Sequence, residues 1–106
     1  MEDAKEAAEE SYEALLNGDY DKFLSGRADM DSIADDYREQ LLTSYKQFIT
    51  QQRNAHNGIN GITAKSARID STQHLIQVFL LVNYADSLQE EICVPMVERN
   101  GEWVMK

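Results

Sequence analysis

The sequence predicts an α+β domain in which N-terminal helices pack on a curved, four-stranded antiparallel sheet. Three observations support this fold class. Apolar residues recur at every third or fourth position in the first half, as in helices, but alternate in the second half, as in strands. Asn100-Gly101 is the dipeptide typical of a two-residue hairpin turn. The length of 106 residues suits one domain, so we expect residues 1–106 to share a single core.

The first predicted element is an amphipathic helix over residues 2–16. Acidic residues in its first turn suit the helix dipole, and Asn17-Gly18 ends it. Asp19 then caps a short helical segment, Tyr20 to Leu24, which Ser25-Gly26 terminates. The apolar positions of the first helix are Ala4, Ala8, Tyr12, Leu15 and Leu16.

A long helix is predicted to begin at Met30 and to stop at Asn57-Gly58. Helical period persists there for more than five turns, and acidic residues between Asp29 and Glu39 occupy the other faces. We read those acids as a solvated face, because Ca²⁺ binding needs oxygen ligands clustered in a tight loop. The apolar positions are Met30, Ile33, Ala34, Tyr37, Leu41, Tyr45, Phe48 and Ile49.

Four strands are predicted, over residues 62–69, 75–84, 92–97 and 103–105. The Asn100-Gly101 turn sets the register of the last two, and the three-residue loop Ala85-Asp86-Ser87 sets that of the middle two. We expect a turn with Gly rather than Ser after Asp86. The first strand has two mixed faces and allows no choice of register. The predicted pairs are Tyr84 with Leu88, Leu80 with Ile92, Met96 with Met105, Val97 with Val104, Glu98 with Trp103 and Arg99 with Glu102.

This register divides the sheet into two apolar faces. The inner face, under the helices, carries Ile76, Val78, Leu80, Val82, Tyr84, Ile92, Val94, Met96, Trp103 and Met105. The outer face is too apolar for water, so we predict a homodimer assembled through it. Its predicted interface residues are Leu75, Phe79, Leu81, Cys93 and Val97.

Charge and hydropathy exclude two classes of function. The net charge is −9, and residues 1–53 carry 13 acidic against 6 basic side chains. Such a field repels phosphate backbones, so we exclude nucleic-acid binding. The longest apolar run, Leu75 to Tyr84, is too short for a transmembrane segment. No export signal precedes the first helix, which fits either a cytoplasmic protein or a mature fragment without its signal. The lone Cys93 fits a small buried hydrophobe better than a reactive thiol.

Two segments resemble a known superfamily: AEESYEALLNGDYDKFL, from Ala8, and VFLLVNYADSLQEEICVPMVERNGEWVMK, from Val78 to the end. They look like small bacterial domains of unknown function in the nuclear transport factor 2-like (NTF2-like) superfamily, often found in cell-envelope lipoproteins. The resemblance is strongest at Gly18-Asp19-Tyr20 and at the Asn100-Gly101 hairpin. It implies a cone-shaped fold and location in the cell envelope, periplasmic or lipid-anchored, with the cytoplasm as the alternative.

Enzymes of that superfamily transfer protons inside the cone with an Asp, His or Tyr in an apolar pocket. On the inner face of this chain the polar candidates are His74, Tyr84, Glu90 and Glu98. His74 and Glu98 fall near strand ends, where we expect solvent as the neighbour. His56 most simply interacts with the end of its helix. We therefore predict no catalytic constellation, no metal site and no cofactor. Aromatic residues with polar tips suit a pocket for a small amphipathic ligand: Tyr12, Tyr37, Tyr45, Tyr84 and Trp103.

The sequence thus favours a non-catalytic binding or scaffolding domain of the bacterial cell envelope, with a small amphipathic ligand held in the cone. The alternative is an isomerase- or cyclase-type enzyme that uses a cone carboxylate or tyrosine as general acid or base. An open cone with a buried Glu90 or Asp beside Tyr84 would favour that alternative, and a cone filled by side chains would exclude it.

Overall fold

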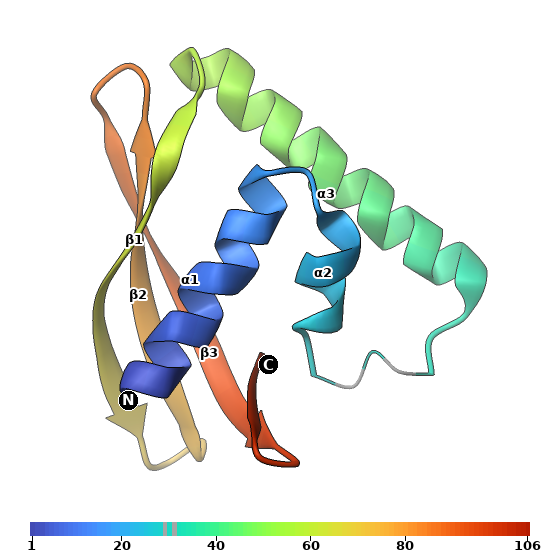
Figure 1. Ribbon diagram of the computed structural model, residues 1–106, viewed down its shortest axis with the longest axis vertical. Coiled ribbons are helices and arrows are strands. Elements are labelled where there is room, and N and C mark those ends of the chain that lie inside the picture. Colours follow the sequence, from blue (N-terminus) through green and yellow to red (C-terminus); the bar gives the residue numbers. More distant parts are fainter. Residues whose placement is uncertain (29, 31) are drawn as a thin grey trace.

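A computed structural model describes residues 1–28, 30 and 32–106 of the chain (Figure 1). Three helices come first and four strands follow. The elements are α1 (Glu2–Leu16), α2 (Tyr20–Ser25), α3 (Asp35–His56), β1 (Ile59–Asp70), β2 (Leu75–Tyr84), β3 (Gln89–Arg99) and β4 (Glu102–Met105).

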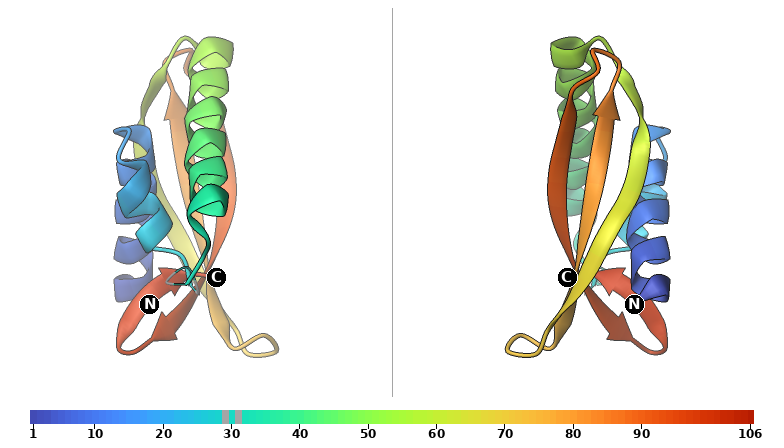
Figure 2. Two further views of the ribbon diagram at one scale, coloured as in Figure 1. Left: turned by 90° about the vertical axis from the view of Figure 1, so that its right-hand side faces the viewer. Right: turned by 90° about the vertical axis from the view of Figure 1, so that its left-hand side faces the viewer.

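The four strands form one antiparallel sheet in the order β1-β2-β3-β4, so each strand pairs with its neighbour along the chain. The sheet is strongly twisted, and α1 lies across it while α2 lies between α1 and α3 (Figures 1 and 2). This confirms the predicted α+β class and the predicted number of strands.

The β2–β3 hairpin has the predicted register, with Leu80 opposite Ile92. The Tyr84 amide donates to the Leu88 carbonyl at 3.0 Å, which closes the three-residue loop. Ser87 occupies the left-handed region at φ 70°, where Gly is favoured on steric grounds. A serine therefore takes the glycine-type conformation that this turn requires.

The β3–β4 hairpin also has the predicted register, with Glu98 opposite Trp103 and Arg99 opposite Glu102. Asn100 and Gly101 both have positive φ, 53° and 82°, as a type I′ turn requires. Because these two turn residues fix which residues of β3 and β4 pair, the local sequence is enough to specify the register of the hairpin.

The register of β1 is irregular in a way that its sequence does not reveal. Its pairing with β2 shifts twice, between Ile59 and Gly61 and between Ala64 and Ser66. At the second shift, the Ala64 amide donates to Glu9 Oε2 of α1 at 2.7 Å. The inward and outward alternation is therefore interrupted, which explains why both faces of this strand looked mixed.

The core lies between α1 and the inner face of the sheet. Ala4 and Ala8 of α1 are fully buried, because small side chains let the helix approach the strands closely. Beneath them, Val78, Leu80 and Met96 are fully buried as predicted. The other buried members of this cluster are Leu15, Phe23, Ile49, Ile62, Ile76, Val82, Tyr84, Val94 and Met105.

Helix α3 departs most from the prediction. It begins at Asp35 and not at Met30, and Asp31, which the predicted helix included, lies outside the described residues. Only Ile49 of α3 is buried, whereas Tyr37 and Phe48 are each 47% exposed. Its apolar positions keep helical period along the whole helix, but most of them are not buried against the sheet.

A candidate ligand cavity between α3, α1 and the sheet

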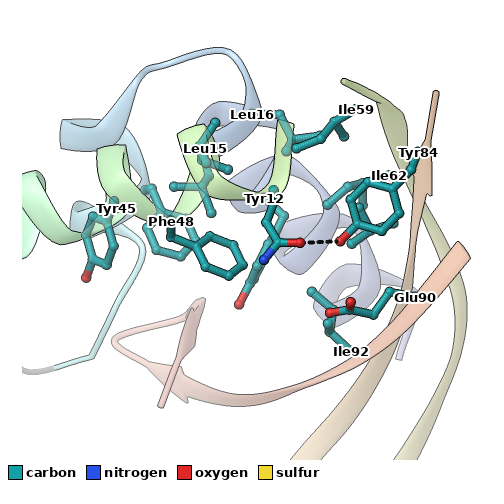
Figure 3. Close-up of a pocket in the computed structure, with 14 residues that line it drawn as sticks. Tyr12, Leu15, Leu16, Tyr45, Phe48, Ile59, Ile62, Tyr84, Glu90 and Ile92 are labelled. Atoms are coloured by element: carbon teal, nitrogen blue, oxygen red, sulfur yellow. Dashed lines mark hydrogen bonds between the residues drawn. The ribbon is translucent and has the colours of Figure 1, made fainter. Parts of the chain in front are cut away.

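A cavity of about 230 Å³ lies between α3, α1 and the inner face of the sheet (Figure 3). Its walls are largely apolar. The side chains that line it are Tyr12, Leu15, Leu16, Phe23, Tyr45, Phe48, Ile49, Gln52, Ile59, Ile62, Val82, Tyr84, Glu90 and Ile92.

The periodicity of each element explains why these side chains meet. Tyr45, Ile49 and Gln52 recur at every third or fourth position of α3 and so share one helix face. Val82 and Tyr84 alternate along β2 on the inner face of the sheet. The loosely packed α3 therefore roofs the cavity and the tightly packed sheet forms its floor.

One end of the cavity is polar. The Tyr84 hydroxyl donates to Gln52 Oε1 at 3.2 Å and thereby joins β2 to α3 (Figure 3). Glu90, an exposed residue of β3, reaches the same part of the cavity. Burial raises the pKa of Tyr84 above 10.0, and the negative charges of Glu90 and Asp86 raise it further. Tyr84 thus remains a protonated hydrogen-bond donor across the neutral range.

His56 and Asp86 support Tyr84 from outside the cavity. The His56 ring stacks on the Tyr84 ring with centroids 3.8 Å apart, and His56 Nδ1 lies 2.9 Å from Asp86 Oδ2. Partial burial would raise the pKa of Asp86, but hydrogen bonds from His56 and from the Leu88 amide lower it below its usual 3.8. The end of α3 is therefore joined to the β2–β3 loop.

The other end of the cavity is aromatic. Phe23 of α2 packs edge-to-face against both Tyr12 and Tyr45, with centroid separations of 5.1 and 4.9 Å. Arg27 Nη1 donates to the Tyr45 hydroxyl at 2.7 Å. Burial raises the pKa of Tyr12, and the nearby positive charge of Arg27 offsets part of that rise.

The backbone holds Arg27 in place. The segment after α2 pairs with β4, since the Met105 amide donates to the Gly26 carbonyl at 2.7 Å and the Ala28 amide to the Met105 carbonyl at 2.6 Å. Gly26 also lies close to α1, since a Cβ there would lie 2.8 Å from Ser11 Oγ and that side chain would have to move. Arg27 is half-buried as a result.

The structure brings together three of the five predicted pocket residues, Tyr12, Tyr45 and Tyr84. Tyr37 is exposed near the start of α3, and Trp103 lines a separate shallow hollow beside His74. Sequence reasoning missed Gln52 and Arg27. The position of Gln52, seven residues after Tyr45, could have indicated it, but no sequence signal indicates Arg27.

The predicted interface residues lie on the outer sheet face with unequal exposure. Leu75 and Val97 are each only 5% exposed within the single chain. Phe79 and Leu81 are half-buried, and Cys93 is exposed, contrary to its reading as a buried hydrophobe. The Arg68 guanidinium lies 5.7 Å from the Phe79 ring centroid and covers part of this face.

The described residues, which leave out positions 29 and 31, offer neither a metal site nor a membrane-spanning helix. Among them, no group of three or more His, Cys, Asp or Glu side chains is arranged to hold a metal ion. None of their helices combines the length and the apolar character that crossing a bilayer demands.

Comparison with known proteins identifies the fold of the chain. No family model matches the sequence, and no curated protein matches it significantly. A solved structure from Campylobacter jejuni, named as a proposed NTF2-like transpeptidase, superimposes with a TM-score of 0.69 at 14% sequence identity. The match covers 92% of each chain. The chain therefore has the NTF2-like fold that its sequence resembles.

Proposed function

We propose that this chain is a non-catalytic binding domain whose cone holds a small amphipathic ligand. The observation that carries the proposal is the cavity of about 230 Å³, whose apolar walls end in a small polar group formed by Tyr84, Gln52 and Glu90. Binding sites for small molecules commonly combine apolar walls with a few polar groups that orient the ligand.

The location of the cavity supports this proposal. It lies where α3, the element with only one buried residue, meets the well-packed sheet. A ligand in the cavity would contact the apolar side chains of α3 that line it, such as Phe48. We therefore expect ligand binding to stabilise the protein, since a molecule that binds only the folded state shifts the unfolding equilibrium.

Titration with 1-octanol, a neutral amphiphile, tests the proposal. Ile92→Trp places a larger ring in the cavity, and Leu88→Trp adds the same ring at a position that is 58% exposed. We expect calorimetry to detect octanol binding to the unmodified protein and to Leu88→Trp, with an affinity at least about tenfold lower for Ile92→Trp. Absence of binding to the unmodified protein, or equal binding to both variants, would contradict the proposal.

A specific observation also favours the enzymatic alternative. The cone is open and Glu90 lines the cavity beside Tyr84, although Glu90 is exposed and not buried as the expectation required. Tyr84, whose pKa is raised, could stabilise a developing oxyanion by donating a hydrogen bond, while Glu90 accepts a proton as general base. An isomerase- or cyclase-type reaction needs no more than these two groups.

Matched variants separate the alternative from simple binding. Tyr84→Phe and Glu90→Gln each keep the shape of the side chain and remove the donor or the base. An enzyme would lose turnover of a ketosteroid or polyketide-like substrate in both variants. A binding domain would show no turnover in any form, and its affinity for octanol would change little in Glu90→Gln.

The name of the Campylobacter structure suggests a different chemistry, which the cavity does not support. Transpeptidation uses a nucleophile that accepts an acyl group, such as a serine or cysteine. None of the described residues that line the cavity is a serine, threonine, cysteine or lysine. We therefore do not carry this activity over to the chain.

We further propose that the domain acts in the bacterial cell envelope and as a homodimer. The resemblance to lipoprotein-associated domains supports the location in the cell envelope, and fractionation of cells that express the native gene would test it.

The apolar strip formed by Phe79, Leu81 and Cys93 on the outer sheet face supports the homodimer. Because Leu75 and Val97 are already buried in the single chain, we expect a modest interface and moderate affinity.

A further inference from the structure

The two ends of the cavity differ in charge. Figure 3 shows Tyr45 at one end and Tyr84 at the other. At the Tyr84 end, Glu90 contributes negative charge. At the Tyr45 end, the Arg27 guanidinium donates to the tyrosine hydroxyl at 2.7 Å. A ligand with one charged group would therefore be oriented by the cavity.

Arg27 also lines a second hollow, of about 250 Å³, next to the cavity. Tyr12, Phe23 and Tyr45 line both spaces and so form a common wall. A ligand whose apolar body rests on these rings would therefore lie next to the hollow that Arg27 lines. The remaining residues around this hollow are Cys93, Val94, Pro95, Met105 and Lys106.

The surroundings of Arg27 differ from those of the surface lysines. Lys5, Lys22 and Lys65 each lie within 3.4 Å of a carboxylate oxygen. Arg27 is half-buried and contacts a neutral hydroxyl, and no carboxylate of residues 1–28, 30 and 32–106 forms an ion pair with it. Its guanidinium has five N–H donors, and the one hydrogen bond that it makes within residues 1–28, 30 and 32–106 uses Nη1.

We infer that the ligand is an anionic amphiphile, with an aliphatic or aromatic body and one carboxylate that pairs with Arg27. This inference rests on the proposed function, because the apolar body occupies the same cavity. Arginine binds carboxylates through two parallel hydrogen bonds, and such charge-assisted bonds are stronger than neutral ones. The overall charge of −9 disfavours anions in general, so a preference for an anion requires a local positive charge such as that of Arg27.

A pair of ligands of equal chain length tests the inference. Octanoate and 1-octanol share their apolar chain and differ in the charge of the head group. At neutral pH, we expect calorimetry to give octanoate an affinity roughly tenfold higher than octanol, as the strength of a charge-assisted hydrogen bond implies. Added salt should weaken octanoate binding and leave octanol binding almost unchanged.

Three variants test whether Arg27 causes the preference for octanoate over octanol. Arg27→Gln should remove the preference for octanoate while octanol still binds, and Arg27→Lys, which keeps the charge but not the planar fork, should retain part of it. Lys65→Gln changes the net charge by the same amount on an exposed side chain of β1 that pairs with Glu91, so it should keep the full preference. Retained octanol binding shows that Arg27→Gln is folded.

The outcomes distinguish this inference from the proposed function. Binding of octanol without preference for octanoate would overturn the inference and leave the proposed function standing. A preference that persists in Arg27→Gln, or that Lys65→Gln removes equally, would overturn it as well. If neither compound binds the unmodified protein, both the inference and the proposed function are wrong.

Discussion

His56 stacks on Tyr84, with ring centroids 3.8 Å apart and 16° between the ring planes. His56 is the last residue of α3 and Tyr84 the last residue of β2, so the contact joins the helix that roofs the cavity to the strand that forms its floor. Together with the His56–Asp86 hydrogen bond, it attaches the end of α3 to the β2–β3 hairpin.

Asp86 should make stability depend on pH in the acid range. Its folded-state pKa lies below the usual 3.8, so its contribution is present above about pH 3.8 and is lost as the pH falls through the folded pKa. Asp86→Asn should lower the thermal midpoint at neutral pH and flatten its decline in acid. Thermal unfolding followed by circular dichroism over a pH series measures both effects.

His56→Phe provides the matched variant for Asp86→Asn. It keeps a ring that can stack on Tyr84 but removes the hydrogen bond to Asp86. Because both changes break the same bond, the double variant should be less destabilised than the sum of the two single variants. Simple additivity would show that the bond contributes nothing.

Tyr12 and Tyr84 should ionise later than the other tyrosines. Burial raises the pKa of both above 10.0. A raised pKa means that the protonated phenol stabilises the fold below about pH 10, and that this contribution is lost as the pH rises through the folded-state pKa. In an ultraviolet titration, the Tyr12→Phe and Tyr84→Phe variants should each lack one of the late-titrating phenols of the unmodified protein. A curve unchanged by either substitution would contradict the burial of these hydroxyls.

The packing of α3 should depend on one side chain. Ile49 is 2% exposed and Phe48, its neighbour in the chain, is 47% exposed. Ile49→Ala should lower the free energy of unfolding by about 2 kcal/mol, and Phe48→Ala by less than about 1 kcal/mol. Urea unfolding measures both. Similar losses would show that α3 is packed more deeply than its exposure indicates.

Trp103 should contribute to stability as a half-buried residue. It packs against the core cluster from the inner face, as its register predicts, but it is not fully enclosed. Trp103→Ala should therefore cost about 2 kcal/mol, less than the roughly 3–5 kcal/mol typical of a fully buried tryptophan. Leu88→Ala, at an exposed position, is the control. An unchanged urea midpoint for Trp103→Ala would mean that this hairpin packs differently.

Phe79→Asp should dissociate the proposed homodimer without unfolding the domain, because Phe79 points away from the helices. Sedimentation at micromolar concentration should show a dimer for the unmodified protein and a monomer for the variant. Gln51→Asp adds the same charge to an exposed position of α3 and should leave the dimer intact. A monomeric unmodified protein would refute the proposal.

The sequence by itself determined the features that depend on neighbours in the chain. Two-residue and three-residue turns set the registers of both C-terminal hairpins, and strand alternation placed Val78, Leu80 and Met96 in the core. The bounds of α1 and α2 were also predicted to within one residue, because the helix-breaking residues that end them are adjacent in the chain.

Only the tertiary structure decided which apolar faces are used. Helical period placed Tyr37 and Ile49 on one side of α3, but period does not tell how much of a helix reaches the sheet. At the irregular register of β1, the Ala64 amide bonds to Glu9, a residue 55 positions away in the chain. The position of Arg27 beside Tyr45 likewise depends on pairing between the segment after α2 and β4. Such contacts join residues that are distant in the chain, so no local pattern encodes them.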